Sequence, residues 1–216
     1  MRFDAVLFDC DGVLVDSEPI TNRVLRDMLA ERGWVLSEAD CMRIFVGKAV
    51  KDESARIERH TGAPVTEDWL AAFRARRNTA LEAELSIIAN AHAAVHAVHA
   101  RHGARIACAS GADRHKVELQ LRKVGLFDYF DGRIFSGHEM ARSKPHPDVY
   151  LAAAAALAAQ PQRCAVVEDT LTGVAAGLAA GATVFAYVPQ GDADVFRRAG
   201  VAEVFSDMAD LPAVLA

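Results

Sequence analysis

Short apolar runs recur along the chain and predict the strands of a sheet. Each run has the length of a strand and is bounded by polar or turn-forming residues. The predicted strands are residues 3–9, Arg105–Ser110, Arg133–Phe135, Cys164–Glu168 and Thr183–Val188. Segments with helical periodicity or composition separate the later strands, at His92–His102, Asp113–Val124 and Asp148–Ala159. Strands that alternate with helices predict a parallel sheet covered by helices on both faces.

Residues from about 16 to 85 break this alternation, because the whole stretch has a helical pattern. The expected helices are Glu18–Arg32, Ser37–Phe45, Val50–His60 and Thr66–Leu85, with turn signals between them. An all-helical block between the first and second strands is most simply an inserted cap. We therefore expect an α/β fold with a Rossmann-like parallel core at residues 1–15 and 86–216, and an all-helical cap at residues 16–85.

A later helix carries glycine at every fourth position, at Gly173, Gly177 and Gly181. In a soluble protein this spacing lets the helix approach the sheet closely. We expect Gly181 to end the helix.

Length and charge restrict the class of protein. A chain of 216 residues is long enough for one good-sized domain with a small insert. Lys and Arg total 24, Asp and Glu total 29, and no basic run occurs, so we expect no nucleic-acid partner. The weakly hydrophobic Ala-rich stretch after Asp148 is broken at Gln160 and Pro161, so we expect no membrane partner. We further expect a cytoplasmic protein. Its expected oligomeric state is a monomer or weak homodimer.

The four cysteines are widely spaced and form no CxxC motif. Three of them lie in or next to strand-like apolar runs, which predicts buried thiols in place of metal ligands or disulfides. These three are Cys10, Cys108 and Cys164, and the fourth cysteine is Cys41.

Two acids follow the first predicted strand, in the segment FDAVLFDCDG at residues 3–12. Side chains alternate along a strand, so Asp9 and Asp11 are expected side by side at its end. Two carboxylates that close need a cation or a shared proton, which points to a metal site or to a nucleophile with an acid/base partner. An ordinary acidic turn is the alternative.

Three further polar groups are expected at the same sheet edge, where ligands bind in open α/β folds. They are Ser110-Gly111, Lys144 in the stretch SKPHPD, and Glu168-Asp169. The four acids would repel a phosphate unless Mg²⁺, which prefers oxygen ligands, and Lys144 compensate their charge. Each group also has a plain structural interpretation: a solvated lysine, a serine that caps a helix, and an acidic helix N-terminus.

Taken together, these motifs resemble those of the haloacid dehalogenase superfamily, in the branch with a helical cap between the first two core motifs. The matching stretches are FDCDGVLVDSE at 8–18, ASG at 109–111, SKPHPDVY at 143–150 and VVEDTLTGVAAGLAAGA at 166–182. Within the superfamily, the chain is most similar to the sugar-phosphate phosphatase and β-phosphoglucomutase-like group.

The resemblance implies a mechanism. Asp9 would attack phosphorus and form an aspartyl-phosphate, while Asp11 would protonate the leaving oxygen and then activate water. Mg²⁺ would bind Asp9, the Asp11 backbone carbonyl and Asp169, with Glu168 as a direct or water-mediated ligand. Ser110, Gly111 and Lys144 would hold the phosphoryl oxygens of a small phosphorylated metabolite, expected to be a sugar or sugar-acid phosphate.

Two alternatives remain open from the sequence. A phosphomutase is disfavoured because Thr21 and Val50 stand where the mutase branch has a histidine and an arginine. A non-catalytic metabolite-binding protein is disfavoured because the charged motif residues needed for catalysis are all present, namely Asp9, Asp11, Lys144 and Asp169. Ile88-Ala89-Asn90 also replaces the Pro-Gly that often precedes the helix re-entering the core.

Two other groups of side chains deserve a prediction. In the cap, Lys48 beside Gly47 is the best candidate for a substrate contact, ahead of the arginine cluster at residues 74–77.

Histidines 92, 96, 99 and 102 share one broad helix face. We expect this face to be partly solvated and not to form a functional metal site.

Overall fold

The computed structural model describes residues 2–216, which form two compact units. The first, called the core unit here, comprises the chain up to Asp16 together with Ser86–Ala216. The second, called the helical unit, is Ser17–Leu85. The chain leaves and re-enters the core unit at adjacent positions, because Asp16 N donates to Ser86 O at 3.0 Å and Val15 forms a bridge with Ile87.

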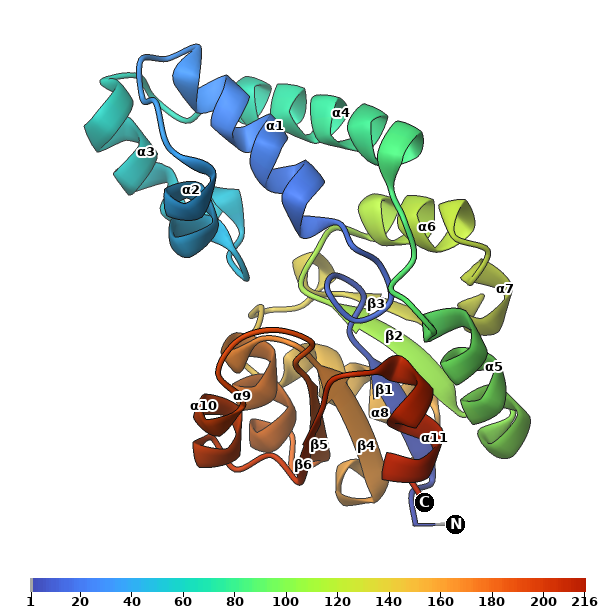
Figure 1. Cartoon of the computed structure of the whole chain (residues 1–216). Helices are drawn as coiled ribbons and strands as arrows, with labels where there is room; N and C mark the ends of the chain where they lie inside the picture. Colours follow the sequence, from blue (N-terminus) through green and yellow to red (C-terminus); the bar gives the residue numbers. More distant parts are fainter. Residues whose placement is uncertain (1) are drawn as a thin grey trace. The chain divides into compact units, whose positions relative to one another are not determined.

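The core unit is built on one six-stranded parallel sheet, which confirms the predicted α/β class (Figure 1). The strand order is β3-β2-β1-β4-β5-β6, so β1 lies in the interior between β2 and β4. The strands are β1 (Ala5–Phe8), β2 (Ile106–Ser110), β3 (Ile134–Ser136), β4 (Cys164–Glu168), β5 (Thr183–Tyr187) and β6 (Glu203–Phe205). In register, Val6 pairs with Ile106 of β2 and with Ala165 of β4.

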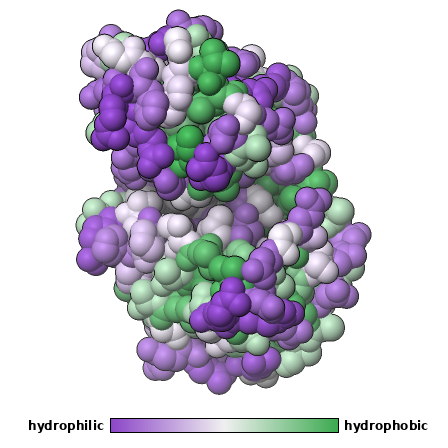
Figure 2. All heavy atoms as spheres, turned by 60° about the vertical axis from the view of Figure 1, so that its left-hand side comes forward, coloured by the Kyte–Doolittle hydropathy of each residue, from purple (hydrophilic) through white to green (hydrophobic). Residues whose placement is uncertain are grey.

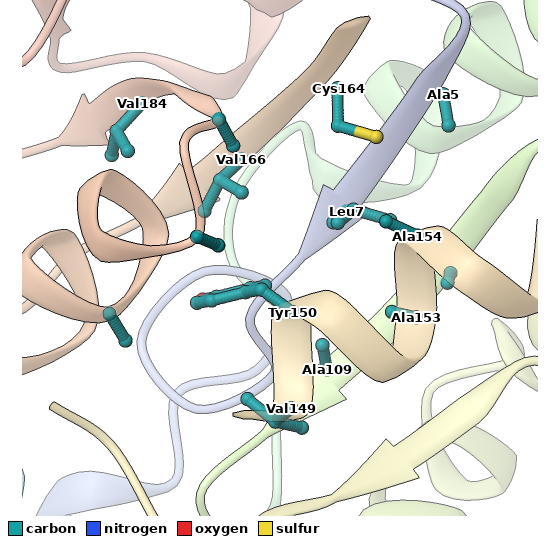
Figure 3. Packing of buried hydrophobic residues seen from close by; sticks show 14 of the residues in the cluster. Ala5, Leu7, Ala109, Val149, Tyr150, Ala153, Ala154, Cys164, Val166 and Val184 are labelled. Atoms are coloured by element: carbon teal, nitrogen blue, oxygen red, sulfur yellow. The ribbon is translucent and has the colours of Figure 1, made fainter. Parts of the chain in front are cut away.

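Helices cover both faces of this sheet. They are α5 (Ala91–His102), α6 (Arg114–Lys123), α7 (Phe127–Phe130), α8 (Asp148–Ala156), α9 (Leu171–Ala179), α10 (Ala193–Arg198) and α11 (Leu211–Val214). The face that carries Leu7 and Val166 packs against α8 and α9, as Figure 3 shows for the side chains of α8. On the opposite face, Phe8 packs edge-on against Phe130 of α7, and α7 and α11 both contact α5.

Close packing of α9 on the sheet depends on its glycines, as the sequence predicted. A Cβ at Gly177 would lie 2.7 Å from a methyl group of Val184 and 3.2 Å from one of Val166. Gly181, with φ of +83°, follows the end of the helix in the left-handed conformation that favours glycine. The helix is therefore held against β4 and β5 at a distance that excludes a side chain at residue 177.

The helical unit contains α1 (Glu18–Ala30), α2 (Glu38–Phe45), α3 (Ser54–Thr61) and α4 (Glu67–Glu84). Helix α1 packs against both α2 and α4. These helices enclose their own apolar core, in which Leu25, Leu29, Ile57 and Phe73 are all buried. The predicted helix at 50–60 is divided, because residues Val50–Glu53 form a 3₁₀ turn ahead of α3.

The apolar side chains of both units are largely enclosed. Among the described residues, the large hydrophobic side chains that are exposed are Val35, Leu151 and Leu171. Figure 2 shows hydrophobic residues interspersed with hydrophilic ones on the face that it presents. All four cysteines are buried and free, as predicted for Cys10, Cys108 and Cys164; Cys41, for which no burial was predicted, is buried as well. Between residues 2 and 216, no helix has both the length and the apolar character needed to cross a membrane.

Candidate active site

Asp9 and Lys144 form the centre of a buried cluster beyond the carboxyl end of β1. The Lys144 ammonium group donates to Asp9 Oδ1 at 2.6 Å and to Glu168 Oε1 at 2.7 Å. All three side chains are less than 10% exposed. Asp9 follows β1, Glu168 ends β4, and Lys144 precedes α8, so three segments far apart in the sequence meet here.

Burial and charge shift the pKa values of these groups in different directions. Burial is the main cause that raises the pKa of Asp9 to about 7; Lys144 works against this shift, and the charges of Glu168 and Asp11 add to it. Burial works against the charge of Lys144, but Asp9 and Glu168 raise the pKa of its ammonium group well above the usual value. Burial likewise opposes ionisation of Glu168, yet Lys144 lowers the pKa of that carboxyl group.

Glu168 is held by five hydrogen bonds. Its Oε1 accepts from Lys144 and from the Tyr150 hydroxyl at 2.8 Å. Its Oε2 accepts from Asp169 N at 3.0 Å and from both N and Oγ1 of Thr170 at 3.1 Å. A Cβ at Gly173 would lie 1.7 Å from Glu168 Oε1, so glycine is required there. The residue that caps α9 is Thr170 and not Glu168.

Asp169 completes a set of carboxylates that fits a divalent cation. One oxygen from each of Asp9, Glu168 and Asp169 lies within 4.8 Å of the other two. Gly12, with φ of +77°, makes room for this arrangement, because a Cβ there would lie 2.0 Å from Asp169 Oδ2. A donor set made only of oxygen atoms suits Mg²⁺. Burial and the repulsion between neighbouring carboxylates raise the pKa of Asp9. A bound divalent cation would offset both effects, because it stabilises the ionised carboxylate.

Asp11 is held separately from Asp9, by donors that the sequence did not reveal. Its Oδ1 accepts from Lys116 Nζ at 2.7 Å and from Gln120 Nε2 at 2.8 Å. Strand β1 ends at Phe8, so strand alternation does not extend to Asp11. Asp11 lies instead in a turn closed by Gly12 N on Val15 O. The Asp11 charge is nevertheless close enough to raise the pKa of Asp9.

Ser110 and Gly111 lie at the end of β2, beside the lysine. A Cβ at Gly111 would lie 4.0 Å from Lys144 Cδ, so the Gly111 backbone passes next to the Lys144 side chain. Ser110 is buried, and its Oγ accepts from Ala112 N at 3.1 Å. The cap of α6 is Asp113, so Ser110 does not serve as a helix cap.

Lys48, the predicted substrate contact, belongs to the helical unit. Its ammonium group lies 3.0 Å from Glu53 Oε1, and Glu53 also pairs with Arg56 at 2.8 Å. Gly47 before it has φ of +72°, which matches the predicted turn. In the arginine cluster, Arg74 and Arg76 pair with acids of the same unit, and Arg77 is buried.

The histidine face of α5 packs on Tyr129. The rings of His92, His96 and His99 lie edge-on to the Tyr129 ring with centroid distances of 5.9, 6.3 and 5.3 Å. His102 differs from the other three because it is buried. At about 100° per residue it lies at the margin of the histidine face, next to the buried side of α5 that carries Val95 and Val98.

Three residues of the cluster were missed from the sequence: Lys116, Gln120 and Tyr150. Helix α6 buries positions 116, 117, 120 and 121, so Lys116 and Gln120 lie on its buried face. A lysine on the buried face of a helix was a usable signal. For Tyr150, Figure 3 shows the side chain on the first turn of α8 among the strand residues, and its hydroxyl is the part that reaches Glu168.

The sequence of this chain matches the family model of the haloacid dehalogenase-like hydrolases over residues 3–181. The chain belongs to this family. It is 30% identical over 185 residues to the 6-phosphogluconate phosphatase of Escherichia coli strain K12, covering 85% of this chain and 82% of that protein. It is 31% identical over 180 residues to hexitol phosphatase B of the same strain, covering 82% and 79%.

A solved structure extends the likeness over the whole chain. A family hydrolase from Deinococcus radiodurans R1, solved with bound phosphate and sodium, superposes with a TM-score of 0.79 at 37% identity and covers 100% of this chain and 96% of that one. These comparisons confirm the predicted family and the prediction of a hydrolase of the phosphatase type. They also place this haloacid dehalogenase-like hydrolase among relatives named for sugar phosphates.

Proposed function

We propose that this hydrolase is a Mg²⁺-dependent phosphatase that acts on a small phosphorylated metabolite through an aspartyl-phosphate intermediate. The observation that carries the proposal is the buried Asp9 carboxylate, paired with Lys144 and adjacent to the oxygens of Glu168 and Asp169. This arrangement combines a nucleophile, a fixed positive charge and an oxygen-only set of metal ligands.

In the first step, an Asp9 oxygen forms a bond to phosphorus while the bond between phosphorus and the leaving oxygen breaks. Asp11 gives its proton to that leaving oxygen. In the second step, Asp11 takes a proton from water, the water oxygen attacks phosphorus, and Asp9 is released. Lys144, Ser110 and the Gly111 amide are proposed to hold the phosphoryl oxygens, where negative charge increases during transfer.

Asp9, Asp169 and the backbone carbonyl of Asp11 are the proposed Mg²⁺ ligands. The two oxygens of Glu168 already accept five hydrogen bonds, so a contact through water suits Glu168 better than direct coordination. When bound, Mg²⁺ supplies positive charge that keeps Asp9 ionised and neutralises the phosphoryl group.

The substrate class proposed is a sugar phosphate or sugar-acid phosphate, in keeping with the names of the relatives. We propose that the helical unit is the cap that selects the substrate and that Lys48 contacts it. Light scattering tests the further expectation of a monomer or weak homodimer.

The deciding experiment is a phosphate-release assay over sugar phosphates, sugar-acid phosphates and nucleotides, with Mg²⁺ and with EDTA. Asp9→Asn serves as the control, because it removes the nucleophile at nearly constant volume. We expect Mg²⁺-dependent release that Asp9→Asn abolishes. Isomerisation of a sugar phosphate with little phosphate release would identify a mutase, and binding of a substrate without any turnover would identify a non-catalytic protein.

A further inference from the structure

Lys116 is a buried cation to which the mechanism above gives no part. Its side chain is only 7% exposed, and its ammonium group lies 2.7 Å from Asp11 Oδ1. Burying a lysine is costly unless its charge is paired and hydrogen-bonded. Asp11 supplies that pairing, which links the position of Lys116 directly to the residue proposed as the acid/base.

Gln120 adds a second donor to the same oxygen. It lies one helical turn after Lys116 on α6, is fully buried, and donates through Nε2 to Asp11 Oδ1 at 2.8 Å. The other end of its amide is also engaged, because Gln120 Oε1 accepts from the Cys10 thiol at 3.6 Å. The turn that carries Cys10 and Asp11 is therefore tied to one face of α6 at two points.

The start of α6 fixes where these donors lie. Asp113 caps the helix by accepting from Lys116 N at 2.9 Å, so the first turn is anchored at the residue whose side chain reaches Asp11. Positions four apart lie on the same helix face, which directs Lys116 and Gln120 to the same carboxylate.

We propose that Lys116 and Gln120 are positioning residues that orient the Asp11 carboxylate for proton transfer. This inference rests on the proposed phosphatase function. An aspartate in a turn can rotate about its side-chain torsions, and proton transfer requires its carboxylate within hydrogen-bond reach of the leaving oxygen. Two donors on Oδ1 restrict that rotation.

The leaving group distinguishes positioning of Asp11 from a merely structural role. A sugar or glycerol alkoxide is strongly basic and needs a proton as it departs, whereas 4-nitrophenolate departs readily without one. In Lys116→Met, we expect kcat/KM for glycerol phosphate to fall about 10- to 100-fold, within the range of a misplaced or lost general acid. We expect kcat/KM for 4-nitrophenyl phosphate to fall less than about threefold, since departure of this group depends little on a general acid.

Three variants carry the experiment. Lys116→Met removes the ammonium group at similar length, Gln120→Leu removes the amide at similar volume, and Lys123→Met is the matched control, because Lys123 is an exposed lysine on the same helix. Lys116→Arg, which keeps a donor and a positive charge, is expected to recover part of the activity on glycerol phosphate. If Lys116→Met does not fold, Gln120→Leu and Lys116→Arg test the same proposal.

A double variant shows whether Lys116 acts through Asp11. If it does, Asp11→Asn with Lys116→Met is no slower on glycerol phosphate than Asp11→Asn alone. Calorimetric titration with Mg²⁺ should give the same affinity for Lys116→Met and for the unmodified protein. Equal losses on the two esters, or additive losses in the double variant, would overturn the inference. Normal kinetics in Asp11→Asn, or no phosphatase activity in the unmodified protein, would refute the proposed function itself.

Discussion

Asp9 Oδ1 and Lys144 Nζ are 2.6 Å apart in an environment from which solvent is largely excluded. The same ammonium group also pairs with Glu168, so one cation serves two buried carboxylates. Removing one partner of a buried ion pair costs more stability than the pair contributes, because a charge is left uncompensated. Lys144 is therefore expected to affect both catalysis and the stability of the metal-free protein.

Lys144→Met should destabilise the metal-free protein by about 3–5 kcal/mol, the usual effect of breaking a buried pair. It should also lower turnover by about 10²- to 10³-fold, as loss of a group that stabilises transition-state charge does. Mg²⁺ should raise the melting temperature of this variant more than that of the unmodified protein, because it replaces the missing cation. Thermal melts with and without Mg²⁺ check this. An equal Mg²⁺ effect in both proteins would contradict it.

Asp11→Asn separates the acid/base role from metal binding. The expected metal ligand at this residue is the backbone carbonyl, which the substitution leaves in place. Turnover should fall about 10²- to 10⁴-fold while Mg²⁺ affinity, measured by calorimetry, stays unchanged. A collapse of Mg²⁺ affinity with normal turnover at saturating metal would require the roles of Asp9 and Asp11 to be exchanged.

Lys48→Ala should lower kcat/KM for the native substrate more than for 4-nitrophenyl phosphate, because the generic ester needs only the core site. Lys51→Ala is the matched control, since Lys51 is an exposed lysine nearby that pairs with Glu67 at 3.3 Å. Equal losses on both substrates would mean that Lys48 acts through its ion pair with Glu53 and not through the substrate.

Gly12→Ala should disturb the proposed metal site although it replaces none of the proposed ligands. A Cβ at residue 12 would collide with the Asp169 carboxylate, and the positive φ adds strain for any residue with a side chain. We expect weaker Mg²⁺ binding by calorimetry and a lower melting temperature. Gly33→Ala is the control, because Gly33 also has a positive φ but no neighbour within 4 Å of its Cβ position. Unchanged Mg²⁺ affinity in Gly12→Ala would remove Asp169 from the ligand set.

His102 should make the protein less stable toward acid. Burial, together with the charges of Arg101 and Arg105, lowers the pKa of this imidazole in the folded state. Above a pH of about 6.5, the ordinary pKa of histidine, the His102 imidazole is neutral in both the folded and the unfolded protein. Below that pH the imidazole binds a proton in the unfolded chain more readily than in the folded chain, so the stability of the fold decreases as the pH is lowered. In His102→Leu, the melting temperature should fall less steeply between pH 7 and pH 5. His138→Gln, which removes an exposed imidazole, is the control.

The strands that could be predicted from the sequence are those in which an apolar run of residues is also buried in the folded sheet. The apolar runs that form β2 and β4 are fully buried, and the polar residues at their ends mark the sheet edge. Strand β6 was missed because its three residues form no apolar run, and only Phe205 is buried.

The candidate site could be predicted where chemistry is visible in single residues, as at Asp9 and Lys144. It could not where the role depends on contacts across the chain. The bond from Lys116 to Asp11 joins residues 105 positions apart, and no local feature of the sequence encodes that distance. Asn90 illustrates a different limit: it has φ of +62° just ahead of α5, a conformation that glycine would usually take and that asparagine tolerates.

The hydrogen bond from Asp16 to Ser86 brings the two ends of the helical unit together at one point of the core unit. A segment whose ends already meet can be exchanged or shortened at little cost in chain entropy, because the closure is made by the scaffold and not by the insert. A gene with a short linker in place of residues 17–85 is therefore expected to encode a protein that keeps the six-stranded sheet. If the helical unit selects the substrate, as proposed, its replacement would change the substrate while Asp9, the proposed nucleophile, and Lys144 stay in place in the core unit.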